Sequence, residues 1–260
     1  MVNRIKKETL VSISMLSIVI LLVMIGFALN FDSIANAIDK NFISENYYIE
    51  LLIGLGNTFL ITIVSFIIGL LLGLIICLIE GINSQNIGAL IIKKLAKAYV
   101  SIFRGTPMVV QLLIIYFVLF AFYRGNPIYV AMIAFGLNSG AYVSEILRGG
   151  ITSVPKGQME AGRSLGLSYA SVMRKIIFPQ AIRNALPSLG NEFIALIKET
   201  SICGFIGAVD LTLAFRKIAN ATFDFETVYL VMGVVYFIIV YIITLFLNLI
   251  ERKLINQAKA

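Results

Sequence analysis

Histidine is absent from this 260-residue chain, cysteine is nearly absent, and charged residues are few. Without histidine the chain lacks the commonest metal ligand and the commonest proton relay, which argues against a metalloenzyme and against a histidine-based proton pump. The only two cysteines, Cys77 and Cys203, lie 126 residues apart in apolar surroundings and without metal-ligand spacing. We therefore expect both to be packing residues.

The low charge is itself informative. Charged residues make up 13% of the chain and hydrophobic residues 59%, whereas about a quarter of the residues in soluble domains are charged. The apolar runs are roughly 20 residues long, enough to cross about 30 Å of hydrocarbon as helices, while barrel strands would give short alternating segments. The sequence thus predicts an all-α integral membrane protein.

Six transmembrane helices are predicted from these runs. The first is preceded by Arg4, Lys6 and Lys7 but is long for a signal peptide and lacks a small-residue cleavage site, so we expect it to be retained. The six are about Leu10–Leu29, Leu51–Ile79, Met108–Phe122, Ile128–Ile146, Leu186–Ile206 and Tyr229–Ile250.

The distribution of basic residues predicts the orientation. With the N-terminus inside, the cytoplasmic segments hold 16 of the 21 Lys and Arg residues and the outer loops hold four. This asymmetry places both termini in the cytoplasm. The net charge of +7 is then mainly a topology signal, and we predict no nucleic-acid binding.

Two features are expected to shape the bundle. Gly69 and Gly73 form a small-xxx-small pair, which lets two helices approach closely in lipid. The basic stretch KKLAKAYVSIFRGTP ends with Thr106 as an expected N-cap and Pro107 in the first turn of the third span. A solvated basic loop at 93–104 is the alternative.

A polar stretch of 35 residues, 153–187, separates two apolar segments and is too patterned for a disordered loop. Residues 157–165 can form a short helix that carries Gln158, Glu160 and Arg163. Gly166 can supply the positive-φ stop, and Ser168 can cap the next helix. We expect a small, rigid helical surface on which a partner docks.

The pattern of this stretch resembles the cytoplasmic EAA loop of permease subunits of ATP-binding-cassette importers, specifically the polar amino acid group of the type I fold. Glu160-Ala161-Gly162 is followed at the family spacing by Gly166 and by Ile176-Ile177-Phe178-Pro179. Gly162 and Phe178 depart from the usual Ala and Leu. The resemblance continues through RGTP (104–107), NSGAYVSEILRGGI (138–151), SVPKGQ (153–158), PQAIRNALPSLGNEF (179–193) and LIKETS (196–201).

This resemblance implies an organisation. A five-helix permease core at 49–252, with the coupling loop at 152–185, would follow an added N-terminal part at 1–48 that holds a cytoplasmic tail, an extra transmembrane helix and an outer loop. Residues 253–260 would form a cytoplasmic tail. The residues expected to couple to the ATPase are Gln158, Glu160, Ala161, Gly162, Arg163, Ser164 and Gly166.

The resemblance also implies partners in the cytoplasmic membrane: an ABC ATPase subunit, an extracellular or periplasmic amino-acid-binding protein, and a second permease chain in a homo- or heterodimer. No G-x-x-x-x-G-K-[ST] phosphate loop occurs in the sequence, so ATP hydrolysis must come from another chain. We expect no cofactor on this chain, with ATP and Mg²⁺ bound by the partner.

The fifth predicted span carries the candidate substrate groups. Because positions seven apart nearly superimpose on a helix, Asn191 lies over Lys198 and Glu192 over Glu199. Lys198 could meet the α-carboxylate of an amino acid and Glu192 or Glu199 its amine; together these charges lean toward polar or cationic substrates. A Glu–Lys pair that holds helices together is the alternative. Thr200 and Ser201 extend the same polar face.

Gln111 and Asn138 could line the same cavity or could equally bond helix backbones. A stand-alone secondary transporter or channel would also explain intramembrane charges, but it would leave the EAA-like loop without a purpose, and the sequence shows no convincing internal repeat. Nothing resembles a paired nucleophile and base, so the sequence predicts no enzyme.

Overall fold

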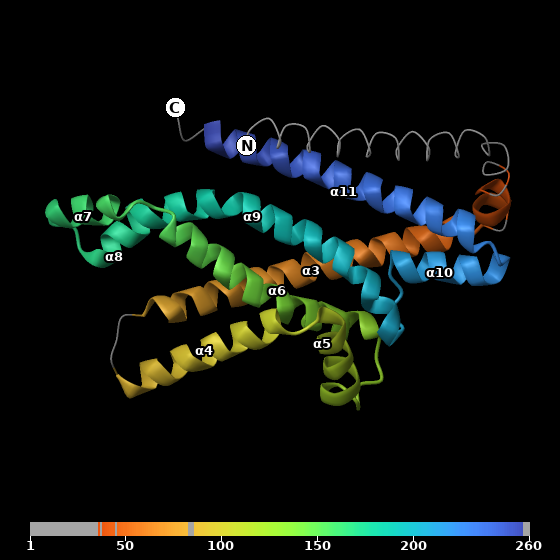
Figure 1. Cartoon of the computed structure of the whole chain (residues 1–260), viewed down its shortest axis with the longest axis horizontal. Coiled ribbons are helices and arrows are strands. Elements are labelled where there is room, and N and C mark those ends of the chain that lie inside the picture. The colour runs from red at the N-terminus through yellow and green to blue at the C-terminus, as the bar shows by residue number, and fades with distance from the viewer. Residues whose placement is uncertain (1–35, 37, 45, 83–85, 257–260) are drawn as a thin grey trace, which may run out of the picture.

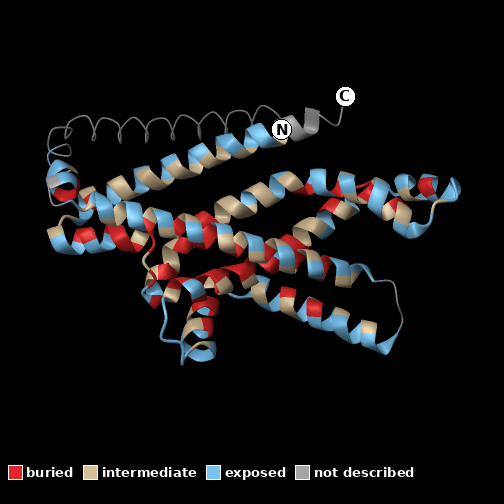
Figure 2. Ribbon diagram, turned by 180° about the vertical axis from the view of Figure 1, so that it is seen from behind, coloured by how far each residue is buried: buried red, intermediate tan, exposed pale blue. Residues whose placement is uncertain are grey.

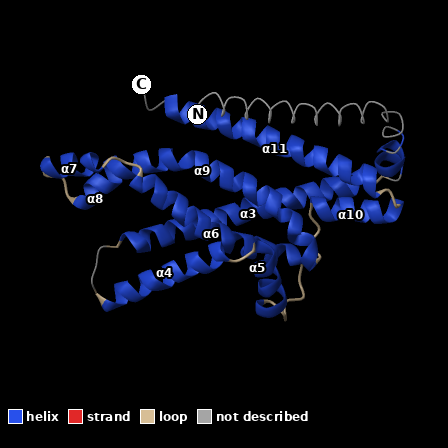
Figure 3. Cartoon of the chain, viewed as in Figure 1, coloured by secondary structure: helices blue, strands red, loops and turns tan. Residues whose placement is uncertain are grey.

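The structure is a computed structural model that describes residues 36, 38–44, 46–82 and 86–256, with the side chains of Ser44 and of 252–256 excluded. It is an elongated bundle of helices (Figure 1). Within the described residues there is no strand, as Figure 3 shows, so the all-α prediction is confirmed for this part of the chain. The first predicted span, 10–29, lies outside the described residues.

Within the described residues, three helices are individually long and apolar enough to cross a membrane. They are α3 (Tyr48–Gly81), α6 (Pro127–Thr152) and α11 (Phe225–Asn256, of which Phe225–Glu251 forms the apolar part), and they match the second, fourth and sixth predicted spans. The most apolar stretch of α11 has no residue buried within the chain. This surface is tan and blue along the outer helix in Figure 2. Such a surface suits hydrocarbon.

The third predicted span differs from the expectation. Residues 108–119 form only a short α5 (Met108–Ile114) followed by a π-helical turn, η2 (Ile115–Leu119). This unit meets the length and hydropathy of a span only together with α4 (Ile87–Gly105), from which it bends by 112°. The described part therefore holds three candidate spans, or four if the bent pair counts as one, and does not reproduce the predicted count.

The basic stretch before this bend is a helix and not a loop. In α4, Ala96 and Val100 are buried against Ile76 of α3, and the Tyr99 hydroxyl donates to the backbone oxygen of Leu137 in α6. The prediction that Thr106 is the N-cap of the following helix was wrong. Pro107 occupies the position before α5, and the hydroxyl of Thr106 donates back to Ile102 O at 2.8 Å.

The fifth predicted span is also shifted. The helix α9 (Phe178–Glu199) begins eight residues before the predicted start, contains Pro187 within it, and continues as the 3₁₀ turn η4 (Thr200–Ile206). It is not among the helices that qualify as spans by hydropathy. The sequence explains why, since α9 carries Arg183, Glu192, Lys198 and Glu199.

The glycine pair on α3 allows the predicted close approach of a second helix, which is α6. A Cβ at Gly69 would lie 2.6 Å from Ser139 Oγ, and a Cβ at Gly73 would lie 2.6 Å from Val143 Cγ1. Only hydrogen fits at these positions, so the two backbones approach closely. Buried residues concentrate where α3 and α6 cross (Figure 2).

The two ends of the bundle carry different small helices. At one end, α7 (Lys156–Ser164), α8 (Tyr169–Val172) and the π-helical turn η3 (Met173–Ile177) project beyond the bundle (Figure 1). At the other end lie α10 (Leu211–Thr222) and the π-helical turn η1 (Asp39–Ser44), whose Phe42 packs edge-on against Phe215. The helical bundle thus has two opposite ends, and at each of them small helices could bind a partner protein.

Candidate functional site

The predicted coupling segment forms the expected pair of short helices. The helix α7 covers Lys156–Ser164, Gly166 has φ +79°, and the Ser168 side chain accepts from Ser171 N at the start of α8. Arg163 supports the bend by donating from Nη1 to Leu167 O at 2.8 Å. The local structure predicted for this segment is therefore confirmed.

The unit has its own small core. Val154, Val172, Ile177 and Ala181 are buried together. A Cβ at Gly162 would lie 2.7 Å from Val172 Cγ2 and 3.4 Å from Ile176 Cδ1. Glycine at this position, where the related pattern usually has alanine, therefore lets α7 pack tightly on α8 and η3.

The opposite face of α7 is open. Gly162 is the only buried member of the predicted coupling set, and the other six are exposed: Gln158, Glu160, Ala161, Arg163, Ser164 and Gly166. Leu165 is 81% exposed beside them. A helix that rests on its own core and presents a polar face with one large apolar side chain is suited to binding a protein partner.

On α9 the predicted polar face is continuous, because the helix runs unbroken from Phe178 to Glu199. Glu192 is half-buried and accepts a hydrogen bond from Ser139 Oγ of α6 at 2.8 Å. Lys198 is exposed and Glu199 is half-buried. Both signs of charge are therefore present on this face, and Glu192 is held by a neighbouring helix.

The two hydroxyl residues after these charges differ. Thr200 is fully buried, and its hydroxyl donates to Ile197 O at 2.7 Å, within its own chain segment. Ser201 is half-buried in η4. Of the two, Ser201 is the one whose side chain is accessible.

Gln111 and Asn138 meet at the bend between α4 and α5. Gln111 Nε2 donates to Phe103 O, Thr106 O and Thr106 Oγ1 at 2.8, 3.0 and 2.8 Å. Asn138 Nδ2 donates to Gln111 Oε1 at 2.9 Å and to Phe103 O at 3.3 Å. The sequence left two roles open for these residues, lining a cavity or bonding helix backbones, and the hydrogen bonds observed are of the second kind. The side-chain amides donate to backbone carbonyl oxygens that have no helical partner because of the 112° bend.

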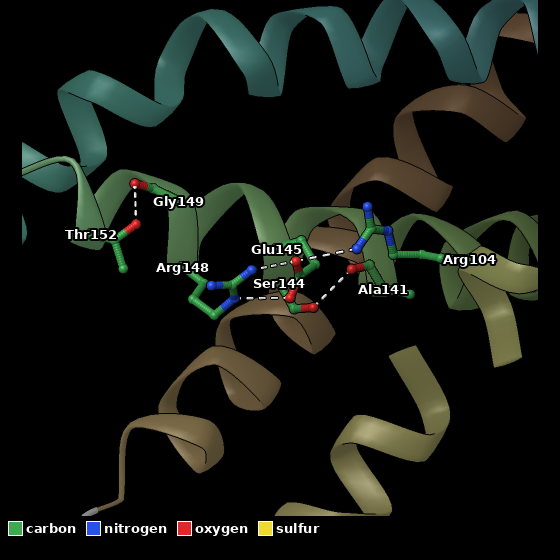
Figure 4. A network of polar contacts seen from close by, with 7 residues as sticks. All are labelled: Arg104, Ala141, Ser144, Glu145, Arg148, Gly149 and Thr152. Atoms are coloured by element: carbon green, nitrogen blue, oxygen red, sulfur yellow. Dashed lines mark hydrogen bonds and ion pairs between the residues drawn. The ribbon is translucent and has the colours of Figure 1, made fainter. Parts of the chain in front are cut away.

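A charged cluster of Arg104, Glu145 and Arg148 lies near the α7 end, and the sequence analysis did not predict it. Figure 4 shows Glu145 of α6 between Arg148 of the same helix and Arg104 of α4. Arg148 binds the carboxylate in a bidentate manner, through Nε at 2.9 Å and Nη2 at 2.6 Å. Arg104 makes one contact, from Nη1 at 3.2 Å, and its guanidinium lies 5.5 Å from the Tyr142 ring centroid.

The spacing of Glu145 and Arg148 on one helix could have indicated the bidentate pair. No sequence signal places Arg104 beside them, since its position depends on how α4 packs against α6. Next to this cluster a cavity of about 650 Å³ opens between α4, α6 and α9.

At the opposite end, two acidic residues serve as helix caps. Asp210 is fully buried and accepts from Thr212 N and Leu213 N at the start of α10. Asp224 accepts from Thr227 N and from Asn41 Nδ2, the latter at 2.7 Å. Arg216 and Glu226 remain exposed.

Comparisons with known proteins give a consistent result. Residues 89–256 match the family model described as "Binding-protein-dependent transport system inner membrane component". The chain is 39% identical over 203 residues to the arginine transport system permease protein ArtQ of Bacillus subtilis, covering 77% of this chain and 90% of that protein. It is 37% identical over 224 residues to the L-cystine transport system permease protein TcyB of the same organism, covering 85% and 94%.

Solved structures agree. A crystal structure titled as an amino acid ABC transporter with histidines superposes with a TM-score of 0.74 at 40% identity, covering 80% of this chain and 95% of that one. An inward-facing structure of the MetNI methionine ABC transporter superposes with a TM-score of 0.68 at 23% identity, covering 82% and 99%. The second likeness shows the fold alone.

Proposed function

Because the chain belongs to the family of binding-protein-dependent transport system inner membrane components, we propose that its α7–α8 unit docks an ATPase and that its α9 face passes a polar amino acid. The general activity follows from the family. The chain is a multi-pass membrane permease subunit of an ATP-binding-cassette importer for amino acids, and it is not a catalytic subunit.

The observation that carries the docking proposal is the open polar face of α7 at the end of the bundle (Figure 1). The tight packing of Gly162 on Val172 makes α7 and α8 one body, and α8 continues through η3 into α9. A movement of a docked ATPase would therefore be transmitted to the α9 helix. ATP and Mg²⁺ would bind the ATPase chain.

The orientation follows from this role. With α7 in the cytoplasm, the end of the bundle with α10 and η1 faces outward, toward a separate amino-acid-binding protein. The distribution of Lys and Arg supports this placement in the cytoplasmic membrane, with both termini on the cytoplasmic side. The exposed Arg216 and Glu226 are the side chains offered to the binding protein at that end.

For the substrate, we assign the α-carboxylate to Lys198 and the amine to Glu192 or Glu199. Ser201 adds a hydroxyl group, and a second permease chain, identical or different, would complete the passage. The curated relatives are named for arginine and for L-cystine, which is compatible with a polar amino acid and does not select one.

The docking proposal is tested by detergent purification of the tagged chain from its own host, with mass-spectrometric identification of bound proteins. The parent chain should recover an ATPase subunit, and Glu160→Arg should lose it. Glu226→Arg is the matched control, because it makes the same charge reversal at an exposed helical site at the other end of the bundle. Loss of the ATPase in both variants, or in neither, would contradict docking on α7.

The substrate proposal is tested by uptake of each of the twenty amino acids in cells, with Lys198→Met beside the parent. We expect the variant to assemble with its ATPase and to lose uptake. Normal uptake kinetics in Lys198→Met would refute the role of Lys198.

A further inference from the structure

The cavity beside the Glu145 cluster has the size of a small-molecule site. Its volume of about 650 Å³ falls within the range of about 300–1,000 Å³ that is typical of ligand pockets. Its polar lining comes from three helices and from the turn that follows α6: Arg104, Tyr142, Glu145, Ser153, Asn184 and Ser188. None of the groups assigned above to the substrate lines it.

The two guanidinium groups beside Glu145 hold its carboxylate unequally. Arg104 and Arg148 share one carboxylate, that of Glu145. Arg148 holds both carboxylate oxygens, and it does not line the cavity. Arg104 holds one oxygen at the longer distance of 3.2 Å and does line it. The guanidinium that faces the cavity is thus the weaker partner of Glu145.

An incoming anion could therefore replace Glu145 as the partner of Arg104 with little loss of free energy. Breaking a charge pair is costly when it leaves a buried charge alone, but Glu145 would keep its bidentate partner Arg148. The Tyr142 ring 5.5 Å away holds the guanidinium by a cation–π contact. The planar fork of arginine matches a carboxylate, which it can bind with two parallel hydrogen bonds.

We propose that the cavity between α4, α6 and α9 is a carboxylate subsite in which Arg104 exchanges Glu145 for the α-carboxylate of the transported amino acid. The hydroxyl group of Ser188 and the amide of Asn184, whose Nδ2 also donates to Ser153 Oγ at 2.8 Å, supply further donors and acceptors around the ligand. The site lies toward the α7 end of the bundle, so the amino acid would occupy it late in its passage. The proposal rests on the function proposed above.

The first test measures the electrostatic potential in the cavity and does not require a known substrate. Ser188→Cys is introduced into the permease–ATPase complex, and its reaction with an anionic methanethiosulfonate (MTSES) is compared with that of a cationic one (MTSET). Labelling is read on this chain by mass spectrometry. The native Cys77 and Cys203 are buried, which limits background.

Adding Arg104→Gln should lower the ratio of anionic to cationic rate by about fivefold or more, since one charge within several ångströms is removed. Glu145→Gln should raise the ratio. Lys94→Gln is the matched control: it removes one charge from an exposed site on α4 that does not line the cavity, and the ratio should stay within about twofold because salt screens charges beyond about 10 Å. An unchanged ratio in Arg104→Gln would overturn the proposal.

The second test uses the ligand. The amino acid identified by the uptake panel, and its methyl ester, are compared for protection of Ser188→Cys in the complex without binding protein. The acid should protect better than the ester, and Arg104→Gln should abolish the difference. Equal protection by acid and ester, in a complex that imports that amino acid, would refute the subsite and leave the importer function standing. If Ser188→Cys does not assemble, Asn184→Cys reports on the same cavity.

Discussion

The close approach of α3 and α6 can be tested with two glycines of the same helix. Gly73→Ala would place a Cβ 2.6 Å from Val143 Cγ1 and 2.9 Å from the backbone nitrogen of Ser144, so a shift of the helices is required. Overpacking of this kind costs about 1–3 kcal/mol, whereas alanine gains about 0.5–1 kcal/mol over glycine within a helix. We expect a net loss of about 1–2 kcal/mol.

Gly56→Ala is the matched control, because a Cβ at Gly56 meets no heavy atom within 4 Å. The assay is thermal melting of the purified chain in detergent, followed by size-exclusion chromatography. A loss of about 1–2 kcal/mol corresponds to a fall in Tm of roughly 2–8 °C for a chain of this size, while Gly56→Ala should melt at or above the parent temperature. Equal Tm values for the two variants would refute the argument that only hydrogen fits between α3 and α6.

Three further outcomes are expected. Asn138→Ala removes the donor to Gln111 Oε1 and Phe103 O, and it should lower the stability by about 1–3 kcal/mol, as measured by the same melting assay. Gly166→Ala meets no steric contact but must adopt φ +79°, which costs about 1–2 kcal/mol; hydrogen exchange should rise in α7 and α8 and stay unchanged in α6. Partial burial raises the pKa of Asp224, but hydrogen bonds from Thr227 N and Asn41 Nδ2 outweigh it and hold the pKa below its usual value of 3.8. Because the folded-state pKa is lowered, this stabilisation is present above pH 3.8 and lost as pH falls further, so the Tm advantage over Asp224→Asn should shrink only in that range.

The sequence was most informative where structure is determined locally. The positive φ at Gly166, the cap at Ser168 and the short helix before them all follow from residues within a few positions of one another. The glycine pair of α3 was recognisable for the same reason, although the sequence did not identify α6 as the helix it packs against.

Errors arose where distant residues decide the structure. The third span was predicted as a separate helix because its hydropathy rises after Pro107, but Gln111 and Asn138 stabilise a bend that joins it to α4. The pairing of Arg104 with Glu145 depends on the packing of α4 against α6 and has no local signature. The roles of Lys198, Glu192 and Glu199 stay predictions.

The central claim is that this chain couples ATP hydrolysis on a partner to amino acid import. The most direct measurement is uptake into proteoliposomes that contain the purified permease–ATPase complex, with the binding protein outside and ATP enclosed. The account predicts accumulation that requires hydrolysable ATP, is lost in Glu160→Arg and persists when ionophores dissipate ion gradients. Accumulation by the chain without an ATPase, driven by a sodium or proton gradient, would contradict it.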